Sequence, residues 1–191
     1  MEKDRERRAR GKNGKETRIE GKIIRIGFVL LVILVGVFIS TYLRQAEDRR
    51  SGNIADPLAR IDSLSELDDK TREAAELFLS LAEEAGLEVK VTETYRTQER
   101  QDYLYEQGRT RIGQIVTWTR NSKHTKRNAF DIAKNVPGEE YSDLDFFRRA
   151  AEIGESIGLE AGYYWTDGKQ DMPHFQMNLF SKVKYPEGYE K

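Results

Sequence analysis

The sequence predicts a compact α+β domain in which a small, mostly antiparallel sheet packs with about three helices, preceded by one transmembrane helix. Three observations lead to this prediction. Helical and strand periodicities alternate after residue 67, the strands are short and few, and one uncharged apolar run precedes them. Short strands joined by long loops favour an α+β arrangement. The 191 residues suffice for about one domain with an appendage.

Charge is unevenly distributed along the chain. The 32 basic and 33 acidic residues nearly cancel, but residues 1–43 contain 10 basic and 5 acidic side chains. The absence of cysteine excludes disulfides and thiolate metal sites, so a metal site would need histidine, aspartate or glutamate ligands. Absence of cysteine does not indicate the compartment.

The uncharged run Ile26–Tyr42 contains 17 residues, of which twelve are Ile, Leu, Val or Phe. These twelve side chains favour bilayer insertion by roughly 4–7 kcal/mol. Extended to residues 23–43, a helix would span about 30 Å, which matches the hydrocarbon core. A buried soluble helix is the alternative, but no polar face appears and both flanks are charged. We therefore predict a transmembrane segment at residues 23–43 that contacts the lipid bilayer.

The flanks of this segment predict its topology. The charged leader of 22 residues is long for a cleaved signal peptide, and no small-x-small cleavage pattern follows the apolar run. Basic residues gather before the run, which predicts a cytoplasmic N-terminus and places residues 44–191 in the periplasm or the extracellular wall space. A nucleic-acid-binding arm is the alternative use of the leader, but topology is the simpler explanation, and we expect no nucleic acid partner.

Four regions follow from these arguments. They are a leader at 1–22, a signal anchor at 23–43, a linker at 44–66 and a domain at 67–191. The linker is polar and without sustained period, with a short helical turn expected near Pro57–Ile61.

The domain begins with a predicted helix that starts at Asp68 and stops at Gly86. In "LEVKVTETY", residues 87–95, apolar and polar residues alternate, which predicts a half-buried strand. The apolar stripe of the helix consists of Ala74, Leu77, Phe78, Leu81, Ala82 and Ala85.

A second helix is predicted between Thr97 as N-cap and Gly108 as stop. A loop follows, with a short strand expected at Ile115–Trp118. A third helix is predicted between Ser142 as N-cap and Gly158 as stop.

Strand periodicity places one ligand-type side chain on each of two further predicted strands. "NAFDIA", residues 128–133, directs Asp131 away from the core, and "PHFQMNLF", residues 173–180, does the same for His174. If these strands are neighbours, the two side chains face one groove. The residues expected to face the core are Phe130, Ile132, Phe175, Met177 and Leu179.

The only other histidine, His124, lies seven residues before Asp131, in a loop able to fold over that groove. Two imidazoles and one carboxylate suit catalytic zinc, since structural zinc usually has four protein ligands. Asp171, three residues before His174, would be placed to act as a base towards an attacking water. Each pattern alone is common, and a histidine is more often an ordinary surface or core residue. Their joint appearance favours metal binding.

Four separated motifs resemble the M15 group of zinc peptidases, which cut peptidoglycan stem peptides. The motifs are "VKVTETYRTQERQDYLYEQGR", "VTWTRNSKHTKRNAFDIA", "GLEAGYYW" and "DMPHFQM", so the resemblance covers about residues 68–180. The chain is most similar to the L-alanyl-D-glutamate endopeptidases of phage lysins and bacterial wall hydrolases. VanY-type D-alanyl-D-alanine carboxypeptidases are more distant. The resemblance implies the fold shared by hedgehog and D-Ala-D-Ala peptidases, a Zn²⁺ cofactor and a peptidoglycan stem peptide as partner.

The resemblance also implies roles for individual residues. His124, Asp131 and His174 would bind zinc, and Asp171 would be the general base. Arg96 matches an arginine that steadies the oxyanion in the family, and a guanidinium is chemically suited to that role. Its alternative is a surface ion pair with an acidic neighbour. The candidate partners are Glu93, Glu99 and Asp102.

Three further residues are candidates for substrate binding by this resemblance, namely Ser122, Arg127 and Trp165. Ser122 could equally be a turn residue, and Trp165 a core residue. Arg127 stands where the family usually has glycine, which would cost of the order of 1 kcal/mol if φ is positive there, unless the turn is reshaped. Arg127 could also contact an acidic stem peptide.

Together these expectations describe a membrane-anchored zinc hydrolase that cleaves an amide bond in peptidoglycan peptides. A D,D-carboxypeptidase is the nearest alternative, and the sequence does not decide between the two. A non-catalytic zinc domain that binds wall peptide is the alternative from another class. The presence of Asp171 argues against it, because structural zinc needs no base.

Overall fold

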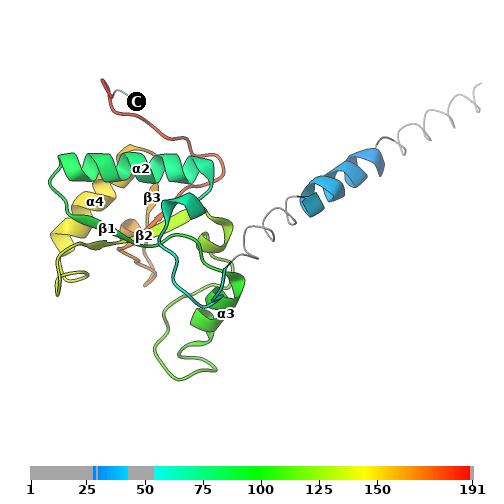
Figure 1. Cartoon of the computed structure of the whole chain (residues 1–191), viewed down its shortest axis with the longest axis horizontal. Coiled ribbons are helices and arrows are strands. Elements are labelled where there is room, and N and C mark those ends of the chain that lie inside the picture. The colour runs from blue at the N-terminus through cyan, green and yellow to red at the C-terminus, as the bar shows by residue number, and fades with distance from the viewer. Residues whose placement is uncertain (1–27, 29, 43–53, 190–191) are drawn as a thin grey trace, which may run out of the picture. The chain divides into compact units, whose positions relative to one another are not determined.

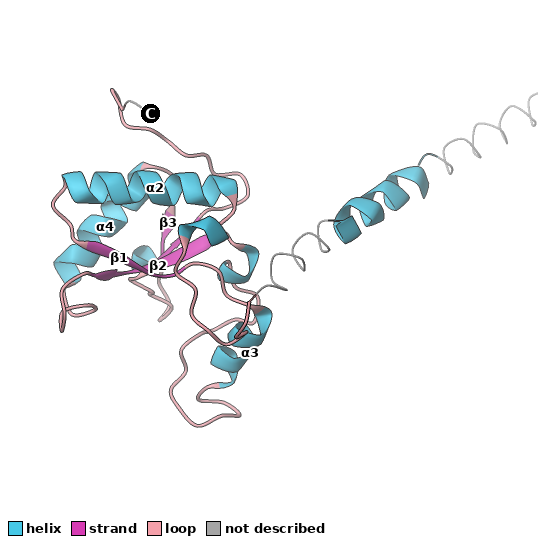
Figure 2. Cartoon of the chain, in the orientation of Figure 1, coloured by secondary structure: helices cyan, strands magenta, loops and turns pink. Residues whose placement is uncertain are grey.

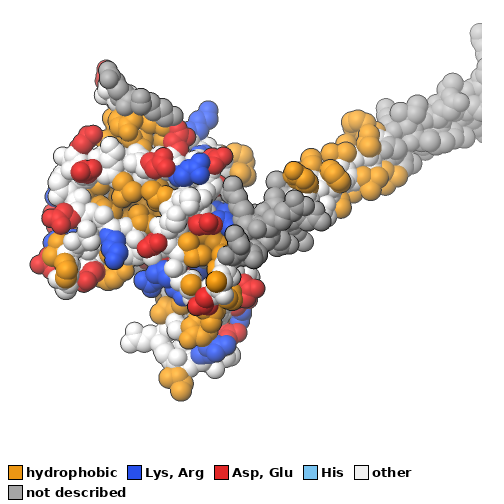
Figure 3. All heavy atoms as spheres, in the orientation of Figure 1, with side chains coloured by type: hydrophobic (Ala, Val, Ile, Leu, Met, Phe, Trp, Pro, Cys, Tyr) orange, Lys and Arg blue, Asp and Glu red, His pale blue; other side chains and the backbone are white. Residues whose placement is uncertain are grey.

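The computed structural model describes residues 28, 30–42 and 54–189. The chain divides into two compact units, residues 1–54 and 55–191. In the first unit, residues 30–42 are helical, and their apolar side chains are exposed around the helix (Figure 3). Among the described residues, no helix combines the length and apolar character needed to cross a membrane. Part of the predicted anchor, residues 23–27, 29 and 43, lies outside the described residues.

The second unit is an α+β domain with a four-stranded, wholly antiparallel sheet in the order β1-β2-β4-β3, as the sequence predicts. Figures 1 and 2 show α2 and α4 together over one side of the sheet, while α3 and its following loop project away from them. The strands are β1 Val89–Glu93, β2 Ala129–Lys134, β3 Glu160–Ala161 and β4 His174–Gln176. The helices are α2 Asp69–Glu84, α3 Gln98–Glu106 and α4 Leu144–Ser156, with 3-10 turns at Leu64–Glu66, His124–Lys126 and Gly162–Tyr164.

Side-chain caps fix where the helices begin. Asp68 accepts a hydrogen bond from the backbone N–H of Thr71 at 2.9 Å, and Thr97 caps α3 in the same way. The cap of α4 is Asp143, which accepts from the N–H of Phe146 at 3.0 Å. The prediction of Ser142 as this cap is therefore wrong by one residue.

Three phenylalanine rings join α2 to the middle of the sheet. Phe78 lies 5.7 Å from the ring of Phe130 and 4.9 Å from the ring of Phe175, and the latter two rings stack at 5.5 Å. All three side chains are fully buried. Phe130 immediately precedes Asp131, and Phe175 immediately follows His174. Because neighbouring side chains on a strand point to opposite faces, burial of the two rings turns Asp131 and His174 away from the core.

A β-bulge interrupts β1 between Val91 and Glu93. Val91 pairs with Ile132, but Glu93 pairs with Asp131, so the register shifts by one residue between Val91 and Glu93. A one-residue shift turns later side chains to the opposite face. Glu93 therefore leaves the core face and joins Asp131, which itself pairs with His174 on β4.

The segment before the domain's first helix is attached to the domain by backbone carbonyls. The carbonyl of Ile61 accepts from the N–H of Thr94 at 2.7 Å, and that of Leu58 accepts from Arg100 at 2.9 Å. The carbonyl of Pro57 accepts from the Thr97 hydroxyl. The predicted helical turn here is a simple turn at residues 57–58.

Two further predictions about strands are wrong. Residues 115–118 form no strand, and within them the Thr117 carbonyl accepts a hydrogen bond from the side chain of Arg109 at 3.2 Å. Leu179 is 79% exposed, because β4 already ends at Gln176. The short strand β3 was not predicted, since two residues carry no readable period.

We expect Phe78→Ala to lower the free energy of unfolding by about 3–5 kcal/mol, because it leaves a cavity beside the stacked rings of Phe130 and Phe175. Denaturant unfolding followed by tryptophan fluorescence would measure the change. Phe180→Ala is the matched control, since Phe180 is 91% exposed, and its effect should stay within about 0.5 kcal/mol. Equal losses from the two substitutions would contradict this account of the core.

Candidate active site

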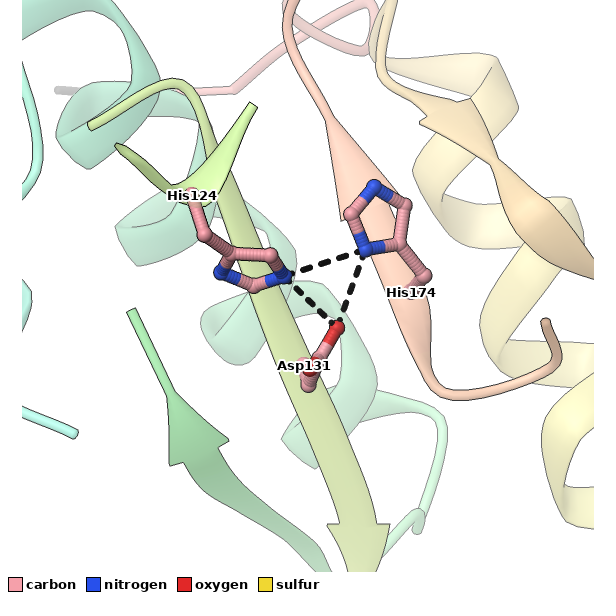
Figure 4. A group of neighbouring side chains, drawn as sticks. All are labelled: His124, Asp131 and His174. Atoms are coloured by element: carbon pink, nitrogen blue, oxygen red, sulfur yellow. Dashed lines mark hydrogen bonds and ion pairs between the residues drawn. The ribbon is translucent and has the colours of Figure 1, made fainter. Parts of the chain in front are cut away.

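Three side chains from separate parts of the chain converge on one point (Figure 4). Asp131 projects from β2, His174 from β4, and His124 from the 3-10 turn that precedes β2. Oδ1 of Asp131 lies 3.1 Å from Nε2 of His124 and 3.0 Å from Nδ1 of His174, and these two nitrogens are 3.2 Å apart. Both histidines are buried, whereas the Asp131 side chain is 19% exposed.

The remaining nitrogen of each imidazole has its own acceptor. Nδ1 of His124 donates to the carbonyl of Thr94 at 2.7 Å. Nε2 of His174 donates to Oε1 of Gln176 at 3.3 Å, and the Gln176 amide donates in turn to Glu160 at 3.0 Å. In a neutral imidazole these bonds favour a proton on the outer nitrogen, which leaves the inner nitrogen as a lone-pair donor towards the common point.

Electrostatics keep the central carboxylate ionised. Burial raises the pKa of Asp131, but the charges and hydrogen bonds of His124 and His174 outweigh burial and hold that pKa well below its ordinary value. Burial lowers the pKa of His174, and the Asp131 carboxylate more than offsets it, so the pKa is raised. An anion between two imidazoles is a donor set suited to a divalent cation.

The donor set fits zinc in chemistry and in spacing. The three donor atoms all lie within 4.8 Å of one another. Atoms separated by about 3 Å leave a point at about 2.0–2.2 Å from each, which is the usual length of Zn–N and Zn–O bonds. Two histidines and one carboxylate are also a typical ligand set for catalytic zinc.

A cavity of about 1080 Å³ opens over this group. Of the sequence-predicted residues, its lining includes Arg96, Ser122, His124, Asp131, Trp165, Asp171 and His174. Residues of α3, of the loop after it and of the turn before β4 thus line the same cavity as the triad.

Asp171 lies at the rim of the cavity, where its backbone is held firmly. Its N–H donates to the carbonyl of Gly162 at 3.0 Å, and its own carbonyl accepts from the N–H of His174 at 3.1 Å. A Cβ at Gly162 would lie 2.5 Å from the Asp171 carbonyl oxygen, so this contact requires glycine. Although the side chain reaches solvent, partial desolvation raises the pKa of Asp171, and the charge of Asp131 raises it further.

Arg96 is buried and bound on two sides. Nη1 donates to Gln101 at 2.8 Å, Nη2 pairs closely with Glu93, and Asp131 Oδ2 is 3.7 Å away. Nε has no hydrogen-bond partner within the described part of the chain. The ion pair with Glu93 foreseen as an alternative is present, but it is buried in the cavity wall and not on the surface.

The three candidates for substrate binding differ in position. The Ser122 hydroxyl accepts from the N–H of His124 at 3.3 Å, and the Trp165 ring lies 5.1 Å from the ring of His174. Both residues line the cavity, whereas Arg127 is not among its described lining residues. Arg127 has φ 61° and is 6% exposed, and it pairs with Glu66 beneath the ring of Tyr95. The turn therefore keeps its positive φ.

Four functional contacts were not predicted from the sequence. Alternation places Gln176 beside His174, and this signal could have suggested a partner for the imidazole. The Thr94 carbonyl, Glu160 and Gly162 act through contacts between distant segments, for which the sequence carries no local signal.

Comparisons with known proteins agree with this geometry. The sequence profile described as VanY, D-alanyl-D-alanine carboxypeptidase, matches residues 64–176. The peptidoglycan L-alanyl-D-glutamate endopeptidase CwlK of Bacillus subtilis (strain 168) is 32% identical over 125 residues, covering 59% of this chain and 74% of the relative.

The comparison with solved structures finds partial matches. The L-Ala D-Glu endopeptidase ChiX of Serratia marcescens has 23% identity and a TM-score of 0.46, over 63% of this chain and 91% of that one. A vancomycin resistance D,D-pentapeptidase VanY in complex with Zn(II) has 17% identity and a TM-score of 0.45, over 58% and 72% of the two chains. The family profile covers more than half of the chain, and the chain therefore belongs to the VanY family, within the M15 group of zinc-dependent peptidases.

Proposed function

We propose that this protein is a membrane-anchored zinc peptidase that hydrolyses an amide bond in peptidoglycan stem peptides, of the L-alanyl-D-glutamate endopeptidase type. The observation that carries the proposal is the convergence of His124, Asp131 and His174 in a cavity that also holds Asp171 and Arg96. The 32% identity to CwlK supports the choice of bond.

In the proposed mechanism, His124, Asp131 and His174 would hold a zinc ion, which would supply a Lewis acid for the scissile carbonyl and the attacking water. Asp171 takes the proton from the water on its carboxylate and later returns it to the leaving amine nitrogen. The raised pKa of Asp171 suits this role, because it makes the carboxylate a stronger base towards the water. Arg96 contributes positive charge where the oxyanion develops.

The proposed location rests on the apolar segment at residues 23–43, with the N-terminus in the cytoplasm and the domain in the periplasm or the extracellular wall space. Exposed apolar side chains from Leu30 to Ile39 support burial in lipid. Anchoring would raise the local concentration of an enzyme whose substrate is a fixed polymer beside the membrane.

The alternative function is a D-alanyl-D-alanine carboxypeptidase, which the description of the matching family profile favours. The two activities differ in the product. An endopeptidase separates alanine from glutamate inside the stem, whereas a carboxypeptidase releases only a terminal D-alanine.

Digestion of purified muropeptides with the full chain in detergent would distinguish the two activities by product mass. We expect a cut between L-alanine and D-glutamate that a chelator abolishes and added zinc restores. Release of terminal D-alanine alone would establish the alternative. Intact muropeptides in the presence of zinc would contradict both.

Asp171→Ala should retain bound zinc but lower kcat by about 10²–10⁴-fold, the usual contribution of a general base. His124→Ala should lose both zinc and hydrolysis, because it removes a ligand. Metal content of the purified variants and muropeptide turnover are the two measurements. An Asp171→Ala variant that turns over at the parent rate would refute the assigned base.

Replacing Val32 and Leu34 together by aspartate should move the chain from the membrane fraction to the soluble fraction. The two charges oppose insertion by roughly 5–7 kcal/mol, which is comparable to the whole apolar gain. Asn13→Asp, which adds an acid in the leader, is the control and should leave fractionation unchanged. A parent chain found in the supernatant after ultracentrifugation would disprove the anchor.

A further inference from the structure

Glu93 is a buried carboxylate in the cavity wall that the proposed mechanism does not use. Its side chain is 5% exposed, and the bulge in β1 places it directly opposite Asp131. Like charges directly opposite each other on neighbouring strands destabilise a sheet. The bulge therefore creates an unfavourable pair beside the metal ligands unless cations compensate it.

Two guanidinium groups provide that compensation. Arg96 pairs closely with Oε2 of Glu93, and Nε of Arg100 lies 2.7 Å from Oε1. Burial raises the pKa of Glu93, but the two arginines outweigh it and lower the pKa, so the carboxylate is charged. Arg100 is fixed in turn, because its Nη1 donates to the carbonyl of Leu58 at 2.9 Å.

Arg96 thus lies between two carboxylates and binds only one of them directly. Its Nη2 contacts Glu93, but it stays 3.7 Å from Oδ2 of Asp131, beyond hydrogen-bond range. A shift of about 1 Å would convert this second contact into a charge-assisted hydrogen bond. Such a bond would draw electron density from the carboxylate that the metal needs.

We propose that Glu93 is a positioning residue that holds Arg96 off Asp131 and offsets part of its charge, so that Asp131 stays available as a metal ligand. This inference rests on the metal site of the proposed function. In the parent, the carboxylates of Glu93 and Asp131 balance the charges of two guanidinium groups, those of Arg96 and Arg100. Without Glu93, one positive charge is left in excess next to a dication, and this excess weakens metal binding.

The first test measures zinc affinity by competition with a chromophoric chelator, using the full chain in detergent. Glu93→Gln keeps the size of the side chain and removes its charge, and zinc should bind about 10-fold or more weakly. Glu66→Gln is the matched control, since Glu66 also pairs with a buried arginine, Arg127, but does not line the cavity. Its zinc affinity should equal that of the parent.

The second test adds Arg96→Gln to Glu93→Gln. The double substitution removes the excess charge, so zinc affinity should return to within about threefold of the parent, although hydrolysis stays impaired by the loss of Arg96. A purely structural role for Glu93 gives a different result, because losing a second member of the ion-pair network would not restore the metal.

The outcomes separate this inference from the proposed function. A parent chain that does not bind zinc overturns the proposed function itself. A parent that binds zinc, with Glu93→Gln binding equally well or the double variant binding as weakly as Glu93→Gln, overturns only the inference. If Glu93→Gln does not fold, the zinc affinity of the single variant Arg96→Gln tests the inference. Removing the Arg96 charge should not weaken zinc binding, so a zinc affinity about 10-fold below that of the parent would refute the inference.

Discussion

The carboxylate of Asp131 is the group around which the site is organised. It stands on β2, which is paired on both sides, so its position is fixed by β1 and β4 together. One of its oxygens faces two imidazole nitrogens at 3.0 and 3.1 Å, and the other faces Arg96. A shift of register on either side of β2 would separate these partners. The buried phenylalanines that alternate with the polar residues oppose such a shift, because it would expose them to water.

The surroundings of the triad are as specific as the triad itself. Each imidazole has an acceptor on its outer nitrogen, which selects the tautomer that offers a lone pair inward. One acceptor is a backbone carbonyl and the other is an amide whose orientation Glu160 fixes. These contacts come from Thr94, the residue after β1, and from β3 and β4, so several parts of the sheet contribute to the orientation of two side chains.

The sequence predicted those features that depend on period and on local capping chemistry. Alternation identified Asp131 and His174 as side chains pointing away from the core. Thr97 was identified as a cap, and Asp68 as the start of the first helix of the domain. Features that depend on exceptions to a period were missed. Glu93 reaches the cavity only because of a bulge, and strict alternation would have sent it to the core. Residues 115–118 have the composition of a strand, but the Thr117 carbonyl binds the side chain of Arg109, and the neighbouring Thr119 carbonyl binds that of Gln101. No local sequence pattern predicts hydrogen bonds from these side chains to backbone carbonyls.

The carbonyls of Pro57, Leu58 and Ile61 bind Thr97, Arg100 and Thr94, although all three lie before the region that the family profile recognises. The folded domain therefore begins before residue 64, where the match to the family profile begins. A fragment trimmed to residues 64–176 would keep the three proposed zinc ligands and the proposed base. It would lose the carbonyl acceptors of Arg100 Nη1, the Thr97 hydroxyl and the Thr94 N–H, which would then have to donate to water. The N-terminal boundary of the domain drawn from hydrogen bonds lies at Pro57 or before it, whereas the boundary drawn from sequence similarity lies at residue 64.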